Sequence, residues 1–114
     1  MDPRDQRGHT IDLAPIRELL NRIVAAWRPE QVWLFGSRAR GTAALASDWD
    51  VLAVVPDSVE DDAIGPLESW RLVKAAHAHA DVVPCRASDF RRDWDTPNTL
   101  VNEVARSGIL VYER

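Results

Sequence analysis

Two short runs of apolar residues constrain the fold of this chain most strongly. Residues 32–35 form a continuous apolar run that ends at Gly36, and residues 49–55 carry a single acidic residue and end at Pro56. Runs of this length are too short for typical helices and suit strands that are buried on both faces of a sheet. The sequence therefore predicts two strands near the centre of a sheet.

Apolar residues spaced three and four apart predict helices around these strands. The first is predicted over residues 13–27, directly after the start signal Asp12, and a second over residues 65–79. A third is predicted to begin with Thr96 as its N-cap and to stop at Gly108, because these residue types are typical of helix ends.

The rest of the chain alternates between strand and turn signals. Strand character resumes at residues 82–83 before Pro84, Ser88 is a candidate cap for a short turn, and residues 109–112 predict a last strand. This order indicates an α/β or α+β fold with a small sheet covered by helices. A length of 114 residues suits a single domain over residues 1–114.

Five tryptophans are many for a chain of this length. Trp27, Trp33 and Trp70 fall on apolar faces of the predicted elements, so we expect them in the core. Trp49 and Trp94 are expected to be exposed anchors for a partner, because tryptophan is enriched at interaction hot spots.

Charge and composition exclude several classes of protein. The formal net charge of -4, from 14 basic and 18 acidic residues, argues against a broad basic face that binds nucleic acid directly. No apolar run approaches the length of about 20 residues that spans a membrane, and the N-terminus is too polar for a secretory signal. The single cysteine, Cys85, fits a reducing compartment and is interpreted as a packing residue. The expected location is the cytoplasm.

The segment of residues 34–55 carries the strongest chemical signal. A turn at Gly36 and Ser37 follows the first predicted strand, and Asp48 and Asp50 stand at the start of the next. Side chains on a strand repeat every two residues, so both carboxylates project from the same face. The sequence therefore predicts two carboxylates held side by side.

Paired carboxylates of this kind indicate a cation. Like charges at this separation are tolerated when one carboxyl is protonated or a cation lies between them. Oxygen ligands without a nearby histidine or thiol suit magnesium, whose shell is completed by water and substrate phosphates. Gly36 allows the backbone to approach a ligand, and the amides that follow Ser37 open a short helix whose N-terminus favours an anion.

A third carboxylate would complete a site for two metal ions. Asp81 is the best candidate, because it begins the predicted strand at residues 82–83, where a buried acidic residue would need a cation as partner. This assignment depends on that strand lying beside the strand of residues 49–55. The alternative is that Asp81 has no chemical role and is simply an exposed residue at the start of a strand.

Together these motifs resemble a known family. Gly36-Ser37 followed by Gly41, then Asp48-x-Asp50, then Asp81 on a later strand, is similar to the minimal nucleotidyltransferases of the DNA polymerase beta superfamily. These are small partners of HEPN-domain proteins in toxin–antitoxin modules. The resemblance runs from the first helix to the last strand and implies the nucleotidyltransferase fold, a small mixed sheet flanked by helices. The family usually has leucine where this chain has Val51, a conservative change.

The resemblance also implies roles. Asp48 and Asp50 would bind two magnesium ions, Asp81 would bind one of them and help to remove the proton, and Gly36 with Ser37 would hold the triphosphate of ATP. The implied reaction places AMP on a hydroxyl of a HEPN-type toxin, which this chain would silence as an antitoxin.

Several alternatives remain open. Arg40, and less so Arg38, could steady phosphates or could simply be solvated, as arginines on a short surface helix usually are. The protein could also act as an antitoxin by binding alone, or transfer a nucleotidyl group to a small molecule. Homo- and hetero-oligomers are both compatible with the sequence.

Overall fold

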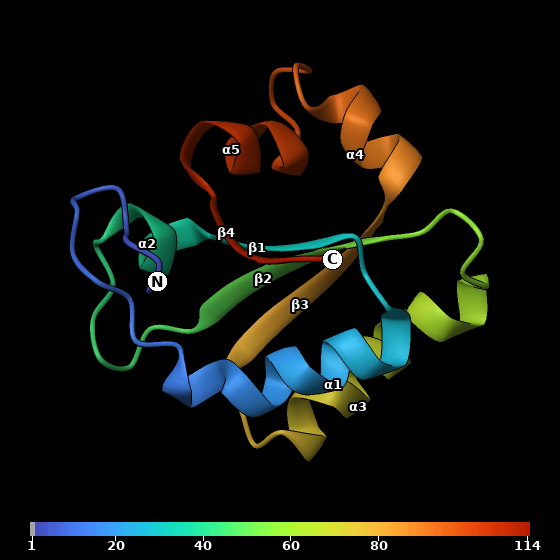
Figure 1. Cartoon of the computed structure of the whole chain (residues 1–114), viewed down its shortest axis with the longest axis horizontal. Coiled ribbons are helices and arrows are strands. Elements are labelled where there is room, and N and C mark those ends of the chain that lie inside the picture. The colour runs from blue at the N-terminus through green and yellow to red at the C-terminus, as the bar shows by residue number, and fades with distance from the viewer. Residues whose placement is uncertain (1) are drawn as a thin grey trace.

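A computed structural model describes residues 2–114 of the chain as one four-stranded sheet with helices on both faces (Figure 1). The strands are β1 (Gln31–Phe35), β2 (Trp49–Val55), β3 (Ala80–Arg86) and β4 (Ile109–Glu113). Their order in the sheet is β3-β2-β1-β4. β1 pairs antiparallel with β2 and β4, whereas β2 and β3 run parallel. The predicted mixed sheet is confirmed.

The helices form two layers (Figure 1). They are α1 (Arg17–Trp27), α2 (Gly36–Arg40), α3 (Pro66–Ala75), α4 (Ala87–Asp93) and α5 (Leu100–Ser107), with 3-10 turns η1 (Ala14–Ile16) and η2 (Asp61–Ile64). α1 and α3 cover one face of the sheet and α4 and α5 the other. No helix within residues 2–114 has both the length and the apolar character needed to cross a membrane.

The central strand β2 is buried on both faces, as its apolar run predicts. Val51 and Ala53 belong to the core beneath α1 and α3, whereas Leu52 and Val54 pack under α4 and α5. Alternate residues of a strand point to opposite faces, so the odd-numbered residues of β2 face α1 and α3. Asp50 therefore belongs to the face covered by α4 and α5.

The helix predicted over residues 65–79 ends early, at Ala75. His77 has a φ of 52°, in the left-handed region that a helix cannot continue through. The amide N–H of Ala78 instead donates to the carbonyl of Val73, at 3.2 Å. This early stop leaves room for β3 to begin at Ala80.

The predicted start of the last helix is also wrong. α5 begins at Leu100, and the Thr99 hydroxyl, not that of Thr96, accepts the N-cap hydrogen bond from the Asn102 N–H at 3.1 Å. Between the two threonines, Asn98 has a φ of 65°. A helix that started at Thr96 would have to pass through this residue, so the later threonine becomes the cap.

Two smaller expectations about β3 and α4 are corrected as well. Pro84 lies inside β3 and does not end it, which is tolerated because β3 is an edge strand where alternate N–H groups face away from the sheet. Ser88 does not cap α4 with its side chain. Its backbone N–H donates to the Asp57 carboxylate at 3.0 Å, so the loop after β2 stabilises the start of α4.

The tryptophans are distributed differently from the prediction. Trp27 is buried and Trp33 half-buried, as expected, but Trp70 is 56% exposed on α3. Trp49 is buried, with the Arg38 guanidinium 4.5 Å above its ring. Trp94 is half-buried against Trp33, with ring centroids 5.8 Å apart. Trp49 shares the face of Val51, so the apolar layer below the sheet covers it.

Candidate active site

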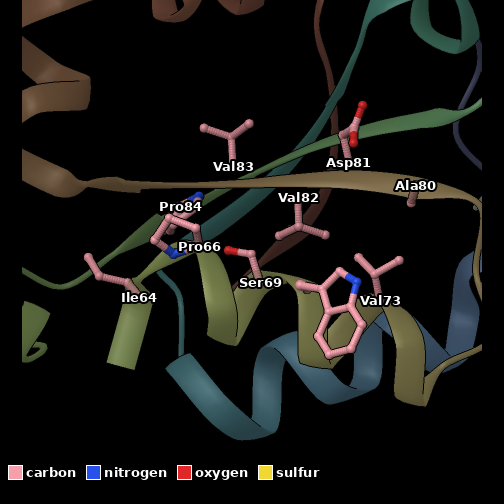
Figure 2. A pocket seen from close by; sticks show the side chains of 10 residues that line it. Ile64, Pro66, Ser69, Val73, Ala80, Asp81, Val82, Val83 and Pro84 are labelled. Carbon is pink, nitrogen blue, oxygen red and sulfur yellow. The ribbon is translucent and has the colours of Figure 1, made fainter. Parts of the chain in front are cut away.

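The parallel pairing of β2 and β3 brings Asp50 and Asp81 together. These two residues are direct partners in the register, one pair in from the end where Trp49 lies beside Ala80. In Figure 2, Asp81 and Val83 project from one side of β3 and Val82 from the side of α3. Asp81 thus shares the face of Asp50. The strand pairing on which the prediction for Asp81 depended is the one observed.

Asp48 stands directly before β2, two residues from Asp50, and its side chain is exposed. The pKa of Asp50 is raised above its ordinary value, first by burial and then by the negative charges of Asp81 and Asp48. The charge of Glu103 acts in the same direction, while Arg40 lowers this pKa. The charges of Asp48 and Asp81 therefore act on Asp50. We name these three residues the aspartate edge.

Gly36 lies against the aspartate edge. It has a φ of 72°, and a Cβ at this position would lie 2.2 Å from the Oδ2 atom of Asp50. Phe35, the residue before it, is the register partner of Asp50 in the antiparallel β1–β2 pair. No larger residue fits here without moving the carboxylate. The positive φ and the close contact with Asp50 therefore both require glycine at this position.

Ser37 follows in α2 and closes the turn through its carbonyl. This oxygen accepts hydrogen bonds from the N–H groups of Gly41 and Thr42, both at 3.0 Å. Gly41 adopts a left-handed φ of 84°, which ends the five-residue helix. The Gly36-Ser37 turn is therefore held at the end of β1, next to the start of β2 where the aspartates lie.

The two arginines of α2 have different environments. Arg38 donates to the carbonyls of Ser47, at 2.7 Å, and Leu45, at 3.2 Å, and so holds the loop before Asp48. Arg40 is exposed and lies with its Nη1 atom 3.9 Å from the Oε2 atom of Glu103. Arg38 therefore supports the loop, and Arg40 is the arginine of α2 whose charge lowers the pKa of Asp50.

Sequence reasoning missed Glu103. This residue lies on α5, which packs against α2, and its charge reaches Asp50. In the sequence it is one more polar residue between the apolar positions Val101 and Val104. No local spacing indicates a role for Glu103, because it comes close to Arg40 and Asp50 only when α5 packs on α2.

A pocket of about 400 Å³ lies between α3 and β3, on the other face of the sheet (Figure 2). Trp70, Val73 and Val82 line it together with Pro84. Asp81 stands at its rim, but its carboxylate points away from these apolar side chains. The pocket is thus separate from the aspartate edge.

The donor set of the aspartate edge fits magnesium. Within residues 2–114, no three histidine, cysteine, aspartate or glutamate side chains form a ready-made metal cluster. Magnesium, however, usually takes one or two protein carboxylates and completes its shell with water and substrate phosphates. Asp50 beside Asp81 offers such a pair, and a divalent cation would relieve the repulsion that raises the pKa of Asp50.

A family model described as "Nucleotidyltransferase domain" matches residues 16–106. The chain belongs to this family. The match covers every element that forms the aspartate edge and the turn beside it. No match was found among curated proteins.

Solved structures share the fold of this nucleotidyltransferase domain. A proposed nucleotidyltransferase from Sulfolobus solfataricus is similar with a TM-score of 0.60 and 21% identity over 90% of this chain and 80% of that chain. A toxin–antitoxin structure with AMP-PNP has a TM-score of 0.58 at 21% identity, covering 91% and 75%. A mutant form of the toxin–antitoxin MntA-HpeT has a TM-score of 0.55 at 21% identity, covering 92% and 75%.

Proposed function

We propose that this nucleotidyltransferase domain transfers AMP from ATP to a hydroxyl group with the help of magnesium. One observation carries the proposal: the parallel register that pairs Asp50 with Asp81 on the face from which the Gly36 turn also approaches. The paired carboxylates supply ligands for a cation, and the glycine turn sets the first residues of α2 beside them.

The reaction is an in-line displacement at the α-phosphorus of ATP. The acceptor hydroxyl oxygen forms a bond to the α-phosphorus while the bond from that phosphorus to the bridging oxygen breaks, and pyrophosphate leaves with its electron pair. Asp81 is exposed at the start of β3 and accepts the hydroxyl proton. The product is an AMP ester of the acceptor.

Each residue of the site has a role in this proposal. Asp48, Asp50 and Asp81 would hold magnesium, which when bound neutralises the phosphate charge that develops during the displacement. Gly36 gives the triphosphate a close approach to the backbone, and Ser37 orients it at the start of α2. Arg40 pairs with a phosphate oxygen through charge-assisted hydrogen bonds.

For the acceptor, we propose a hydroxyl on a HEPN-type toxin, so that the domain acts as an antitoxin in the cytoplasm. Two structural relatives are toxin–antitoxin proteins, and one of these was determined with AMP-PNP, a nucleotide of the ATP type. The acidic chain, with a net charge of -4, suits a protein acceptor better than a nucleic acid.

Label transfer tests this proposal directly. The purified chain, with its co-purified partner, is incubated with magnesium chloride and ATP labelled at the α-phosphate. Label on a polypeptide is expected for the wild type and not for the Asp48→Asn, Asp50→Asn variant. The matched control is Asp62→Asn, an exposed aspartate in η2, which should leave the transfer unchanged.

Other outcomes separate the alternatives. A folded complex that acquires no label, and an Asp48→Asn, Asp50→Asn variant that still protects cells from the toxin, would replace catalysis with neutralisation by binding. Label found only on a small molecule would keep the enzyme and refute the protein acceptor.

A further inference from the structure

We infer that Glu103 is a positioning residue for nucleotide binding: it holds the Arg40 guanidinium over the aspartate edge, where Arg40 meets the triphosphate. This inference rests on the proposed function and extends it to α5, an element that none of the sequence motifs includes. It assigns a role to a carboxylate that does not itself need to touch the nucleotide.

Arg40 and Glu103 form an exposed ion pair. The Nη1 atom of Arg40 lies 3.9 Å from the Oε2 atom of Glu103, and the two side chains are 48% and 41% exposed. Glu103 is the carboxylate within ion-pair distance of Arg40 in the described residues. A guanidinium has five N–H donors, so this single contact orients Arg40 and leaves donors available for phosphate oxygens.

Arg40 lies near two acidic groups, Asp50 and Glu103. The charge of Arg40 acts on Asp50, and Glu103 lies within ion-pair distance of Arg40. A long arginine side chain loses rotamer freedom when it is fixed in one geometry. Glu103 restricts the Arg40 side chain before the nucleotide binds and so reduces the further entropy loss on binding. The guanidinium is then already placed near the proposed position of the phosphates.

Gln6 is hydrogen-bonded to both of the helices that carry this pair. The backbone N–H of Gln6 donates to the Ala39 carbonyl of α2 at 2.9 Å, and its side-chain amide donates to the Ser107 carbonyl of α5 at 3.2 Å. Ala39 precedes Arg40, and Ser107 lies one turn after Glu103. Gln6 therefore bridges the two helices that carry the ion pair, in addition to their direct packing.

Nucleotide affinity tests the inference without an acceptor. Binding of α,β-methylene-ATP in the presence of magnesium chloride is measured by calorimetry for the wild type, Glu103→Gln, Arg40→Gln and the double variant, and thermal melting checks each fold. Glu18→Gln is the matched control, because Glu18 pairs with Arg22 at 2.9 Å on α1, across the sheet.

Loss of an exposed ion pair should weaken binding by about 5-fold in Glu103→Gln. Loss of a charge-assisted contact should weaken it by about 10-fold or more in Arg40→Gln. The double variant should bind no more weakly than Arg40→Gln, since Glu103 has nothing left to position. The melting temperatures and the affinity of Glu18→Gln should match those of the wild type.

Three results would overturn the inference. Unchanged affinity in Glu103→Gln would show that the pair does not position Arg40, while leaving the proposed function intact. A further loss in the double variant would show that Glu103 acts independently of Arg40. A wild-type chain that binds no nucleotide would refute the proposed function as well. If Glu103→Gln melts early, Glu103→Asp, which keeps the charge but shortens the reach, replaces it and should also weaken binding.

Discussion

Gly36 illustrates how one residue can serve both the backbone and the site. It adopts a left-handed φ of 72°, and the Asp50 carboxylate occupies the space where any other residue would carry its Cβ. The glycine is thus part of the surface against which this carboxylate rests. A substitution here acts on Asp50 even though it removes no functional group.

Gly36→Ala is expected to reduce nucleotidyl transfer by about 100-fold or more, because displacement of a catalytic group by roughly 1 Å has an effect of this order. The left-handed backbone adds about 1–2 kcal/mol of destabilisation. Transfer assays and urea unfolding measure the two effects. Gly8→Ala is the control, because Gly8 has a φ of 83° with nothing within 4 Å of its Cβ position. Equal losses in both variants would exclude a specific effect on Asp50.

Cys85 should behave as an unreactive thiol. Burial, and then the charges of Asp89 and Asp93, raise its pKa to about 11. At pH 8, only about one thiol in a thousand is then ionised, and the thiolate is the reactive form. Modification by a disulfide reagent at pH 8 should therefore be slow and should accelerate up to about pH 11. A rate that levels off near pH 9 would contradict this environment.

At the scale of single residues, the candidate site could be predicted only in part. Asp48, Asp50 and Gly36 are signalled locally, by alternation on a strand and by a turn after one. Placing Asp81 in the site depends on the register of two strands, and placing Glu103 there depends on the packing of α5 on α2. Contacts between distant segments have no period in the sequence, which is why Glu103 was missed.

Among the elements, α5 shows why helix starts are harder to predict than helices. Thr96 followed by Pro97 is a strong local start signal, yet Thr99 forms the cap. Both threonines suit a cap by residue type. The left-handed backbone of Asn98 decides between them, and a positive φ at a residue other than glycine is not visible in a pattern of apolar spacing.

Thr99→Ala is expected to destabilise the protein by about 1 kcal/mol, the usual effect of losing an N-cap. Thr96→Ala should cost less, because the Thr96 hydroxyl donates only to the Arg92 carbonyl at 3.2 Å. Urea unfolding of both variants makes the comparison. A larger loss in Thr96→Ala would place the cap at the earlier threonine.

Asp57 links the loop after β2 to α4, and its effect on stability should depend on pH. The backbone N–H of Ser88 and then its side chain lower the pKa of Asp57 below 3.8. A lowered pKa in the folded state stabilises the protein above the unfolded value and loses this effect as the pH falls through the folded value.

Asp57→Asn should therefore unfold at lower urea than the wild type at pH 7. The gap should narrow as the pH falls below 3.8, the ordinary value, because the wild-type carboxyl then becomes neutral as well. Urea midpoints at pH 7 and pH 3 measure this, with Asp62→Asn as the control. A gap that is the same at both pH values would mean that charge has no part in the contact.

In the whole molecule, the larger hydrophobic core and the aspartate edge lie on opposite faces of the sheet. α1 and α3 cover the face of the sheet that holds the larger core, whereas α2 packs against β2, the strand of Asp50, and α5 packs on α2. The alternation of β2 could be predicted from sequence, and so could its burial on both faces. The bridge through Gln6 could not, because it joins segments far apart in the sequence, and such contacts leave no periodic signal.

The parallel pairing of β2 and β3 also determines when during folding the site can appear. Antiparallel neighbours such as β1 and β2 can meet early, but β3 can join only after the chain from Pro56 to His79, including α3, has crossed back over the sheet. Such distant pairings form slowly, because the entropy of closing the loop is lost before the contacts are gained. Asp81 can therefore reach Asp50 only after α3 has been made, so the carboxylate pair cannot arise from a local hairpin.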